Sequence, residues 1–445
     1  ETSLRILNLK DIMKFQTRFL ALTLCAGALL CLLIMLESSI FAEENRTQKS
    51  EVTAKQTDRI ELIGVAEIPG NAIDKSGLNE PLKIQFDNGQ EDPQPVSNNM
   101  VGGFSAAEYS GNGNTFYFLS DRGPFDGAVE WQCRIQTFDI SVDDSASQPK
   151  VKVDHVATTC LTDAEGRPLT GLASFYKSDS THTERLDPEG LRMDAQGNFY
   201  VSDEYGPRLI KFSPTGEMAQ EFQMPEHLLI DNPGLAKVDE NPKNQMGRQT
   251  NRGMEGLAIT DDHLFGLMQS PLLQDSHRET LDQKPMGLNC RLQQFSRTGE
   301  FEKEFLYRLD DAANKLNEIL STGPSQFLVI ERDGEAGVAA KFKKLMLIST
   351  KTASDISGVD RLPAFDEYPD AEPVKKEVFI DLLDPQWNLV GDKMPEKIES
   401  LTFGPDLPDG RRMLIVTSDN DFEAQNATFV YVFAVPRSAF ANALQ

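Results

Sequence analysis

The sequence predicts an all-β protein built as a β-propeller of four-stranded blades. Three observations lead to this prediction. From about Arg59 onward the chain consists of short β-rich runs separated by Gly, Pro, Asp and Asn, and no long segment with helical periodicity follows. A unit that begins with Glu-Gly-Leu or a related frame recurs along the chain. The later half of this unit also repeats, so each unit contains four predicted strands.

Five units are counted, and their uneven spacing leaves a degenerate sixth blade open. The early strand at 59–68 is expected to complete the last unit and so to close the ring. A β-sandwich is the structural rival, but it does not predict the repeated frame. Glycine turns at 197–198, 211–217 and 294–300 are expected to close hairpins. The anchors of the five units are Ser105, Glu189, Glu255, Glu318 and Glu399.

The amino-terminal segment has the features of a secretory signal peptide. Basic residues precede an apolar run at 19–36, and small residues up to Ala42 lead into a polar stretch. We therefore expect a signal peptide at 1–42, of which 1–12 are an upstream extension, then a linker at 43–57 and the propeller at 58–445. An uncleaved membrane anchor is the alternative, because the run just reaches the length that spans a bilayer. Cleavage predicts a secreted or periplasmic protein without a stable membrane anchor.

Cysteine use agrees with export but leaves two states open. Cys133 and Cys160 flank two β-rich stretches that are expected to form one hairpin, so they could form a disulfide. The alternative is that these two residues and Cys290 are free thiols. No Cys or His spacing of a zinc site is present.

Composition excludes several classes of partner. The chain has 445 residues with 69 acidic against 44 basic side chains, a formal net charge of −25, which argues against a nucleic-acid-binding surface. Hydrophobic residues at 39% and charged residues at 25% are ordinary for a globular protein.

Acidic residues recur at equivalent positions of the predicted blades. A propeller gathers such positions around one mouth, where several carboxylates raise each other's pKa unless a cation lies among them. Oxygen ligands without His or Cys favour Ca²⁺, with Mg²⁺ as the weaker candidate. The structural alternative is that these acids lie in turns at the strand ends and accept hydrogen bonds from backbone N–H groups. The predicted metal ligands are Glu189, Glu255, Glu399, Asp121, Asp203 and Asp419.

Other chemistries find little support in the sequence. The five histidines fall outside the repeated frames, and the Gly-x-Ser-x-Gly elbow, the dinucleotide fingerprint, the P-loop and the zinc His-Glu-x-x-His motif are all missing. A Ser-His-Asp hydrolase would need a histidine from a loop.

Several long motifs, in order, resemble the phytase-like domain family, also called esterase-like activity of phytase. The resemblance covers nearly all of residues 59–436. It implies an exported propeller rich in Glu and Asp, with an esterase or phosphoesterase activity. Ser400, where a glycine is common, and Asp421 are mild departures. A more distant likeness is to calcium-dependent lactonase and phosphotriesterase propellers. The motifs are Ser120-Asp121-Arg122-Gly123-Pro124, Asp187-Pro188-Glu189-Gly190-Leu191, Ser202-Asp203-Glu204-Tyr205-Gly206-Pro207, Arg252-Gly253-Met254-Glu255-Gly256-Leu257 and the stretch 398–422.

The leading hypothesis is a metal-dependent hydrolase of phosphate or carboxylic esters that acts on a small-molecule substrate. An uncoordinated carboxylate, Glu204 or Glu331, is the predicted general base. Arg122, Arg252 or Arg332 is predicted to stabilise developing negative charge. A chain this acidic repels an anionic ester, so a polyanionic substrate is expected to need bridging cations. The alternatives are a non-catalytic, calcium-stabilised binding propeller and a lactonase or carboxylesterase.

Overall fold

The computed structural model describes residues 58–85, 96–143, 150–173, 185–234 and 240–440. The chain divides into two compact units, Glu1–Arg59 and Ile60–Gln445, and every strand among the described residues belongs to the second unit. The predicted signal peptide and linker lie outside the described residues. Among the residues that are described, no helix is both long and apolar enough to cross a membrane.

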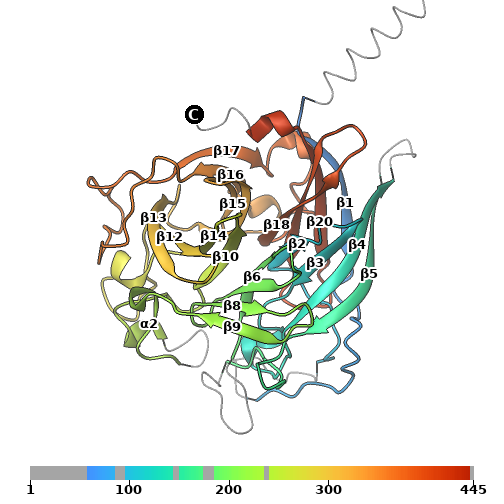
Figure 1. Ribbon diagram of the computed structural model, residues 1–445, viewed down its shortest axis with the longest axis horizontal. Coiled ribbons are helices and arrows are strands. Elements are labelled where there is room, and N and C mark those ends of the chain that lie inside the picture. The colour runs from blue at the N-terminus through green and yellow to red at the C-terminus, as the bar shows by residue number, and fades with distance from the viewer. Residues whose placement is uncertain (1–57, 86–95, 144–149, 174–184, 235–239, 441–445) are drawn as a thin grey trace, which may run out of the picture. The chain divides into compact units, whose positions relative to one another are not determined.

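The fold is a five-bladed β-propeller, as the repeats predict (Figure 1). Each blade is one antiparallel sheet of four strands. The strands are, from blade 1 to blade 5: β2 (Ala106–Tyr109), β3 (Thr115–Leu119), β4 (Arg134–Asp143) and β5 (Lys150–Cys160); β6 (Pro188–Met193), β7 (Phe199–Asp203), β8 (Arg208–Phe212) and β9 (Met218–Phe222); β10 (Met254–Ile259), β11 (His263–Met268), β12 (Asn289–Ser296) and β13 (Phe301–Arg308); β14 (Lys315–Gly323), β15 (Gln326–Arg332), β16 (Lys343–Ser349) and β17 (Lys375–Asp381); β18 (Lys397–Asp406), β19 (Arg412–Asp419), β20 (Thr428–Val435) and β1 (Glu61–Ile68).

The first strand closes the ring, as predicted. β1 pairs antiparallel with β20, from Glu61 opposite Ala434 to Ile68 opposite Thr428, so the two ends of the propeller share one blade. Five sheets account for all the strands in the described part of the chain, and the sixth blade that the spacing left open is not among them. The helices within the described residues are short: α2 (Glu240–Lys243) and 3₁₀ turns at Pro124–Gly127, Glu226–Leu228, Leu273–Asp275, Gly337–Ala339, Pro385–Trp387 and Arg437–Phe440.

The hydrophobic core is divided among the five interfaces between neighbouring blades. Between blades 1 and 2, for example, Leu119 and Ile135 pack against Leu191 and Val201, and all four side chains are fully buried. The other four interfaces are built in the same way. Each such side chain stabilises the fold by about 1.5–3 kcal/mol. Both faces of a blade are therefore apolar, which leaves the ends of the strands for polar chemistry.

The glycine of the repeated frame is required by close contact between inner strands. The inner strands β2, β6, β10, β14 and β18 contact one another in a ring. A Cβ atom on Gly190 would lie 2.7 Å from the Cβ of Leu257, and one on Gly256 would lie 2.8 Å from the backbone oxygen of Asn317. No side chain fits at such distances. The glycine of the frame therefore marks the position at which neighbouring inner strands lie too close for a side chain.

The three described cysteines are free thiols. The predicted hairpin forms, because β4 pairs with β5, but Arg134 rather than Cys133 lies opposite Cys160. Neighbouring residues of a strand point to opposite faces of the sheet, so Cys133 and Cys160 face away from each other. Cys133 is instead buried between blades 1 and 2, with its Sγ 3.5 Å from the backbone oxygen of Leu186. The disulfide alternative does not hold in this structure.

Candidate active site

A β-bulge in the inner strand positions each repeated glutamate. In blade 2, Pro188 pairs with Asp203 and Gly190 pairs with Ser202, which leaves Glu189 without a partner. Glu255 and Glu399 occupy the same extra position in blades 3 and 5. A bulge re-aims the side chain of its extra residue. The repeated glutamates are therefore held at one end of the inner strands, each no more than 6% exposed.

In blade 4 the equivalent residue is Asn317, which corrects the anchor predicted at Glu318. Leu316 pairs with Glu331 and Ile319 with Val329, so the bulge contains both Asn317 and Glu318. The Nδ2 of Asn317 donates to the Oε1 of Glu399 over 3.1 Å. Glu318 takes the place of the frame glycine. The predicted anchor is wrong by one residue, because blade 4 has the amide of Asn317 where blades 2, 3 and 5 have a glutamate.

The end of the second strand contributes another set of polar side chains. Leu316 lies opposite Glu331, and Pro188 lies opposite Asp203, at the same position of blades 4 and 2. The residues that directly follow these two acids, Arg332 and Glu204, are therefore equivalent as well. The register of blades 3 and 5 identifies the two remaining members of this set. Successive side chains of a strand point to opposite faces of the sheet, so these residues point away from the residues that directly precede them. The four residues are Glu204, Gln269, Arg332 and Asp419.

Carboxylates from blades 1, 2, 3 and 5 meet at this end in three overlapping groups, within each of which the oxygen atoms lie within 4.8 Å of one another. Asp121 belongs to two of them and Glu189 to two, so the groups form one continuous acidic cluster. The groups are Asp121 with Asp419 and Asp421, Asp121 with Asp187 and Glu189, and Glu189 with Glu204 and Glu255.

Burial and mutual repulsion disfavour the charged form of these acids. Burial, and then the neighbouring Glu255, hold the pKa of Glu189 well above its usual range. Burial, and then Glu204 and Glu399, do the same to the pKa of Glu255. The pKa of Asp187 is raised to about 6, chiefly by burial. A cluster of this kind is stabilised by a bound cation.

Four of the six predicted metal ligands lie in the acidic cluster, and two lie outside its three groups. Glu399 accepts hydrogen bonds from Asn317 and, over 2.6 Å, from the Nη2 of Arg332. Asp203 accepts the backbone N–H groups of Asp187 and Gly206 over 2.7 and 2.8 Å. Asp203 thus follows the turn-residue alternative. Asp187, Glu204 and Asp421 join the cluster in addition to the predicted ligands.

Glu331, one of the two predicted bases, is the counterpart of Asp203 and faces away from the acidic cluster. Its carboxylate accepts hydrogen bonds from the Tyr307 hydroxyl at 2.8 Å, the Asp310 amide at 2.7 Å and Lys376 at 3.0 Å. The Nδ2 of Asn314 adds another at 2.9 Å. Every one of these contacts is structural, and the side chain is fully buried.

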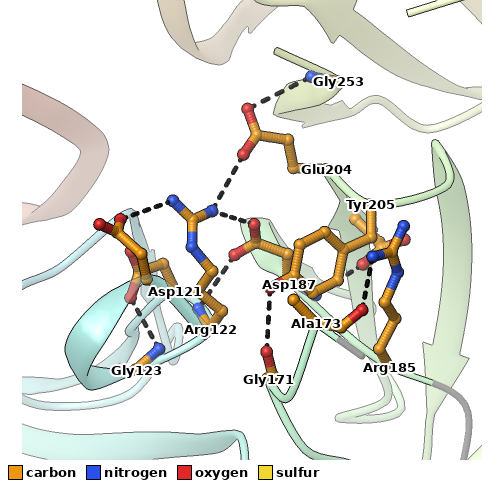
Figure 2. A network of polar contacts seen from close by, with 12 residues as sticks. Asp121, Arg122, Gly123, Gly171, Ala173, Arg185, Asp187, Glu204, Tyr205 and Gly253 are labelled. Atoms are coloured by element: carbon orange, nitrogen blue, oxygen red, sulfur yellow. Dashed lines mark hydrogen bonds and ion pairs between the residues drawn. The ribbon is translucent and has the colours of Figure 1, made fainter. Parts of the chain in front are cut away.

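Arg122 joins blade 1 to the acids of blade 2. Figure 2 shows its guanidinium between the carboxylates of Asp187 and Glu204, with the Glu204 oxygen 3.2 Å from Nη1. The backbone N–H of Arg122 also donates to Asp187 over 2.9 Å. The other oxygen of Glu204 accepts the backbone N–H of Gly253 over 3.3 Å. These contacts fix the orientation of Glu204 at the edge of the cluster.

Two buried amide oxygens beside the cluster accept no hydrogen bond from the described residues. They are the Oε1 of Gln269 and the Oδ1 of Asn317, whose side chains are 5% and 2% exposed. The amide nitrogens of the same side chains donate to Glu255 and Glu399. A buried carbonyl oxygen without a donor is costly in an apolar interior, and neutral amide oxygens are ordinary ligands of hard cations.

Basic side chains from blades 3 to 5 border the same mouth. Lys397 contacts Asp421 and lies 2.9 Å from Asp419, which offsets part of the acidic charge. Arg332 pairs with Glu399. Lys315 is the cross-strand partner of Arg332. Burial and then repulsion by Arg332 and Arg252 lower the pKa of Lys315 to about 8.

A buried arginine closes the channel below the mouth. Arg192 of β6 donates to the backbone oxygen of Ala107 in blade 1 over 2.9 Å and to that of Ile319 in blade 4 over 2.7 Å. It forms ion pairs with Glu318 at 3.0 Å and Glu108 at 3.6 Å. Its side chain therefore joins blades that are not neighbours.

At the other end of the inner strands, a hollow of about 780 Å³ opens between the turns of blades 2 to 4. None of the three acidic groups includes a residue that lines it. The acidic cluster and this hollow therefore lie at opposite ends of the inner strands.

Glu108, which forms an ion pair with Arg192, provides a test of this buried network by pH. Burial raises its pKa to about 7 despite the nearby Arg192. A carboxyl whose pKa is higher in the folded than in the unfolded state binds more protons when folded. It therefore lowers the stability of the fold as pH rises from about 4.5 to about 7. We expect Glu108→Gln to raise the free energy of unfolding by about 1–3 kcal/mol at pH 8. The difference should vanish near pH 4.5 in urea denaturation.

The matched control for Glu108 is Glu377→Gln, which changes an exposed acid of β17. It should leave the stability unchanged at both pH values. Equal stability of Glu108→Gln and wild type at pH 8 would show that Glu108 ionises as freely in the fold as in the unfolded chain.

Besides Asp421, which the sequence shows only as a departure from the family pattern, five residues at the mouth were not predicted as site residues. Asp187 stood inside a quoted motif, one residue before the proline of the Glu-Gly-Leu frame. Gln269 and Asn317 occupy frame positions but are amides, so a search for repeated acids passes over them. Lys315 and Lys397 precede the frame by two residues in their blades, and a repeated lysine at that offset was the signal available.

Comparisons with known proteins found distant matches and one family. An uncharacterized secreted protein of Arthroderma benhamiae is 25% identical, over 63% of this chain and 64% of its own length, so the match spans less than two thirds of that relative. Among solved structures, Trypanosoma rangeli sialidase has a TM-score of 0.34 at 9% identity and covers 79% of this chain and 49% of its own. A gluconolactonase from Xanthomonas campestris has a TM-score of 0.32 at 9% identity, over 84% and 99%.

Identities and scores this low carry no conclusion about activity. The family comparison is more informative. A family model described as phytase-like, esterase-like activity of phytase, matches residues 99–422. This range includes all four bulges and every member of the acidic cluster. Because the match extends over most of the chain, the protein belongs to the phytase-like family, esterase-like activity of phytase.

Proposed function

We propose that this protein is an exported hydrolase of ester bonds that depends on a divalent cation, with Ca²⁺ favoured over Mg²⁺. The observation that carries the proposal is the acidic cluster together with the two buried amide oxygens that accept no hydrogen bond from the described residues. Carboxylates alone are common without a metal. Uncharged, donor-free oxygens of Gln269 and Asn317 beside them complete the ligand set that a hard cation prefers.

The residues at the mouth fit such a cation. Glu189 and Glu255 would hold it, with Gln269 and Asn317 as neutral ligands, and Asp121 and Asp419 extend the acidic cluster toward blade 5. Ca²⁺ is favoured because it accepts many oxygen ligands in irregular geometry, whereas Mg²⁺ demands a near-octahedral set. When bound, a divalent cation polarises an ester oxygen and lowers the pKa of water.

The remaining groups have separate roles in the proposed reaction. Glu204 is the general base, because it borders the acidic cluster and its two oxygens are oriented by Arg122 and Gly253. Arg122 is therefore a positioning residue. Arg252 and Arg332 face the developing negative charge on the ester oxygen. Glu331 receives no role, since its carboxylate already accepts four hydrogen bonds away from the mouth.

Export is part of the proposal. The predicted signal peptide at 1–42, the linker at 43–57 and the propeller at 58–445 would place the enzyme outside the cytoplasm. The secreted relative from Arthroderma benhamiae supports this placement. Free Ca²⁺ is abundant enough there to fill sites of the affinity typical of extracellular modules.

Metal removal tests the proposal. The protein, purified from an exporting host, would be assayed on phosphomonoesters, phosphodiesters, phytate, carboxylic esters and lactones. We expect turnover of at least one class, its loss in excess EDTA and its recovery when Ca²⁺ is added, because the cation supplies the electrophile. Turnover that is insensitive to EDTA would overturn the metal dependence. Calcium binding without turnover of any substrate would instead identify a binding propeller.

A further inference from the structure

Tyr205, which directly follows the proposed general base Glu204, is held in place from several sides. The guanidinium carbon of Arg185 lies 4.3 Å from the centre of its ring (Figure 2). Its hydroxyl donates to the backbone oxygen of Gly171 over 2.9 Å. Its own backbone oxygen accepts two hydrogen bonds from Arg248, over 2.9 Å from Nε and 2.6 Å from Nη2. The ring, the hydroxyl and the carbonyl of this one residue are therefore all fixed.

A single carboxylate joins the two arginines that hold Tyr205. Glu240 is the first residue of α2, in the connection between β9 and β10. Its Oε1 lies 3.1 Å from the Nη2 of Arg185, and its Oε2 lies 2.6 Å from the Nη1 of Arg248. All three of these side chains are no more than 3% exposed. Loss of the Glu240 charge would take a shared partner from two buried guanidinium groups.

The place of Tyr205 affects the direction in which Glu204 points. The Glu204 N–H donates to the backbone oxygen of Asp187 over 2.8 Å, and its carboxylate contacts Arg122 and the N–H of Gly253. A Cβ atom on Gly253 would lie 2.2 Å from the Glu204 backbone oxygen, so the two segments are in direct backbone contact. Adjacent residues share a rigid peptide plane. A movement of Tyr205 is therefore passed to the Glu204 backbone and from there to its carboxylate.

We propose that Glu240 is a positioning residue of the hydrolase. Through Arg185 and Arg248 it fixes Tyr205, and through Tyr205 it sets the direction of the Glu204 carboxylate. This proposal rests on the proposed function, in which Glu204 is the general base. A buried ion pair gives little stability that apolar side chains of the same size could not give, but its hydrogen bonds have direction. Direction matters beside a catalytic group, because a displacement of about 1 Å can cost about a hundredfold in rate.

Steady-state kinetics with Ca²⁺ test the catalytic part of the proposal. Glu240→Gln keeps the shape of the side chain but presents one arginine with an NH₂ group in place of an oxygen. We expect kcat to fall about tenfold or more, while KM and calcium affinity stay within about twofold of the wild type, because Glu240 belongs to none of the three acidic groups. Arg248→Lys should keep more activity than Arg248→Met, since an ammonium can still donate to the Tyr205 oxygen. Glu226→Gln, an exposed acid of the same connection, is the control and should have the wild-type kcat.

Hydrogen exchange tests the structural part without any turnover. The Gly253 N–H donates to Glu204, so its exchange rate in ¹⁵N-glycine-labelled protein reports whether this carboxylate keeps its place. We expect Glu240→Gln to speed this exchange about tenfold or more. Arg185→Met should do the same, and because Arg185 is far from Gly253 in sequence, it separates an effect passed through Tyr205 from local loosening. The buried Gly216 amide, in the turn between β8 and β9, is the control and should exchange as in the wild type.

The two measurements separate this proposal from the proposed function. Unchanged exchange of the Gly253 amide in Glu240→Gln and Arg185→Met overturns the positioning role, whether or not the protein is active. Wild-type kcat in a variant whose Gly253 amide exchanges faster also overturns it. So does a loss of calcium affinity as large as the fall in kcat, because the whole mouth would then have loosened. If the exchange changes as expected but the wild type hydrolyses no ester, Glu240 still orients Glu204 and the proposed enzyme fails.

Discussion

Glu255→Gln is expected to abolish calcium binding and catalysis while making the metal-free protein more stable. Glu255 lies in the bulge of β10, is 5% exposed and shares a group of oxygens with Glu189 and Glu204. Glutamine keeps the oxygen that accepts the hydrogen bond of Gln269 but removes one negative charge. We expect calcium affinity to fall at least 100-fold, about 2.7 kcal/mol, because a carboxylate ligand is lost. Turnover should fall with it.

The rise in stability follows from the repulsion within the acidic cluster. In the absence of a cation, Glu204 and Glu399 disfavour the charged form of Glu255, and burial does so more strongly. Removing this charge should raise the free energy of unfolding of the metal-free protein by about 1–3 kcal/mol. Saturating Ca²⁺ should stabilise the wild type, by about 2.7 kcal/mol at one hundred times its dissociation constant, and leave Glu255→Gln unchanged.

Urea denaturation with EDTA and with Ca²⁺, together with calorimetric titration of Ca²⁺, measures all three effects. Glu377→Gln, an exposed acid of β17, controls for the loss of one charge and should respond to Ca²⁺ as the wild type does. A lower stability of Glu255→Gln in EDTA would mean that this carboxylate is a structural acceptor. In that case the acidic cluster would stabilise the fold without a cation, and the metal proposal would lose its main support.

The fold could be predicted from the sequence because its repeat records a packing constraint. Gly190 and Gly256 are needed where inner strands approach too closely for a Cβ atom, so the frame reappears at each blade that keeps this spacing. Blade closure by β1 was predictable for a related reason, since an isolated first strand and a three-stranded last unit complete each other.

The site was only partly predictable, because sequence reasoning identifies residues by type, whereas register decides their direction. Asp203 and Glu331 look like site residues, but each precedes the residue that faces the mouth. Asn317 lacks the charge that marks the other bulges. The pairing of Arg122 with Asp187 joins residues from two blades, and no local pattern reports a contact between them.

Arg192→Met is expected to destabilise the protein more than any surface substitution, by about 3–5 kcal/mol. Arg192 is 1% exposed, and its guanidinium satisfies backbone oxygens of blades 1 and 4 across the channel. Methionine fills much of the space but donates no hydrogen bond, so both oxygens lose their donor. Glu318, whose pKa burial already raises to about 8 beside Arg192, would keep no cation partner among the described residues.

A double variant separates the lost ion pair from the lost contacts between blades. Arg192→Met combined with Glu318→Gln should recover at least 1 kcal/mol of the loss, because the uncompensated charge is gone, while the bare backbone oxygens keep the rest of the cost. Arg437→Met is the control, since its ion pair with Asp406 is exposed and should contribute less than about 1 kcal/mol. Urea denaturation of the three variants gives these differences. If Arg192→Met unfolds within about 1 kcal/mol of the wild type, apolar packing between neighbouring blades holds the ring without help from its axis. A large loss that Glu318→Gln fails to recover would place the whole effect in the backbone contacts across the channel.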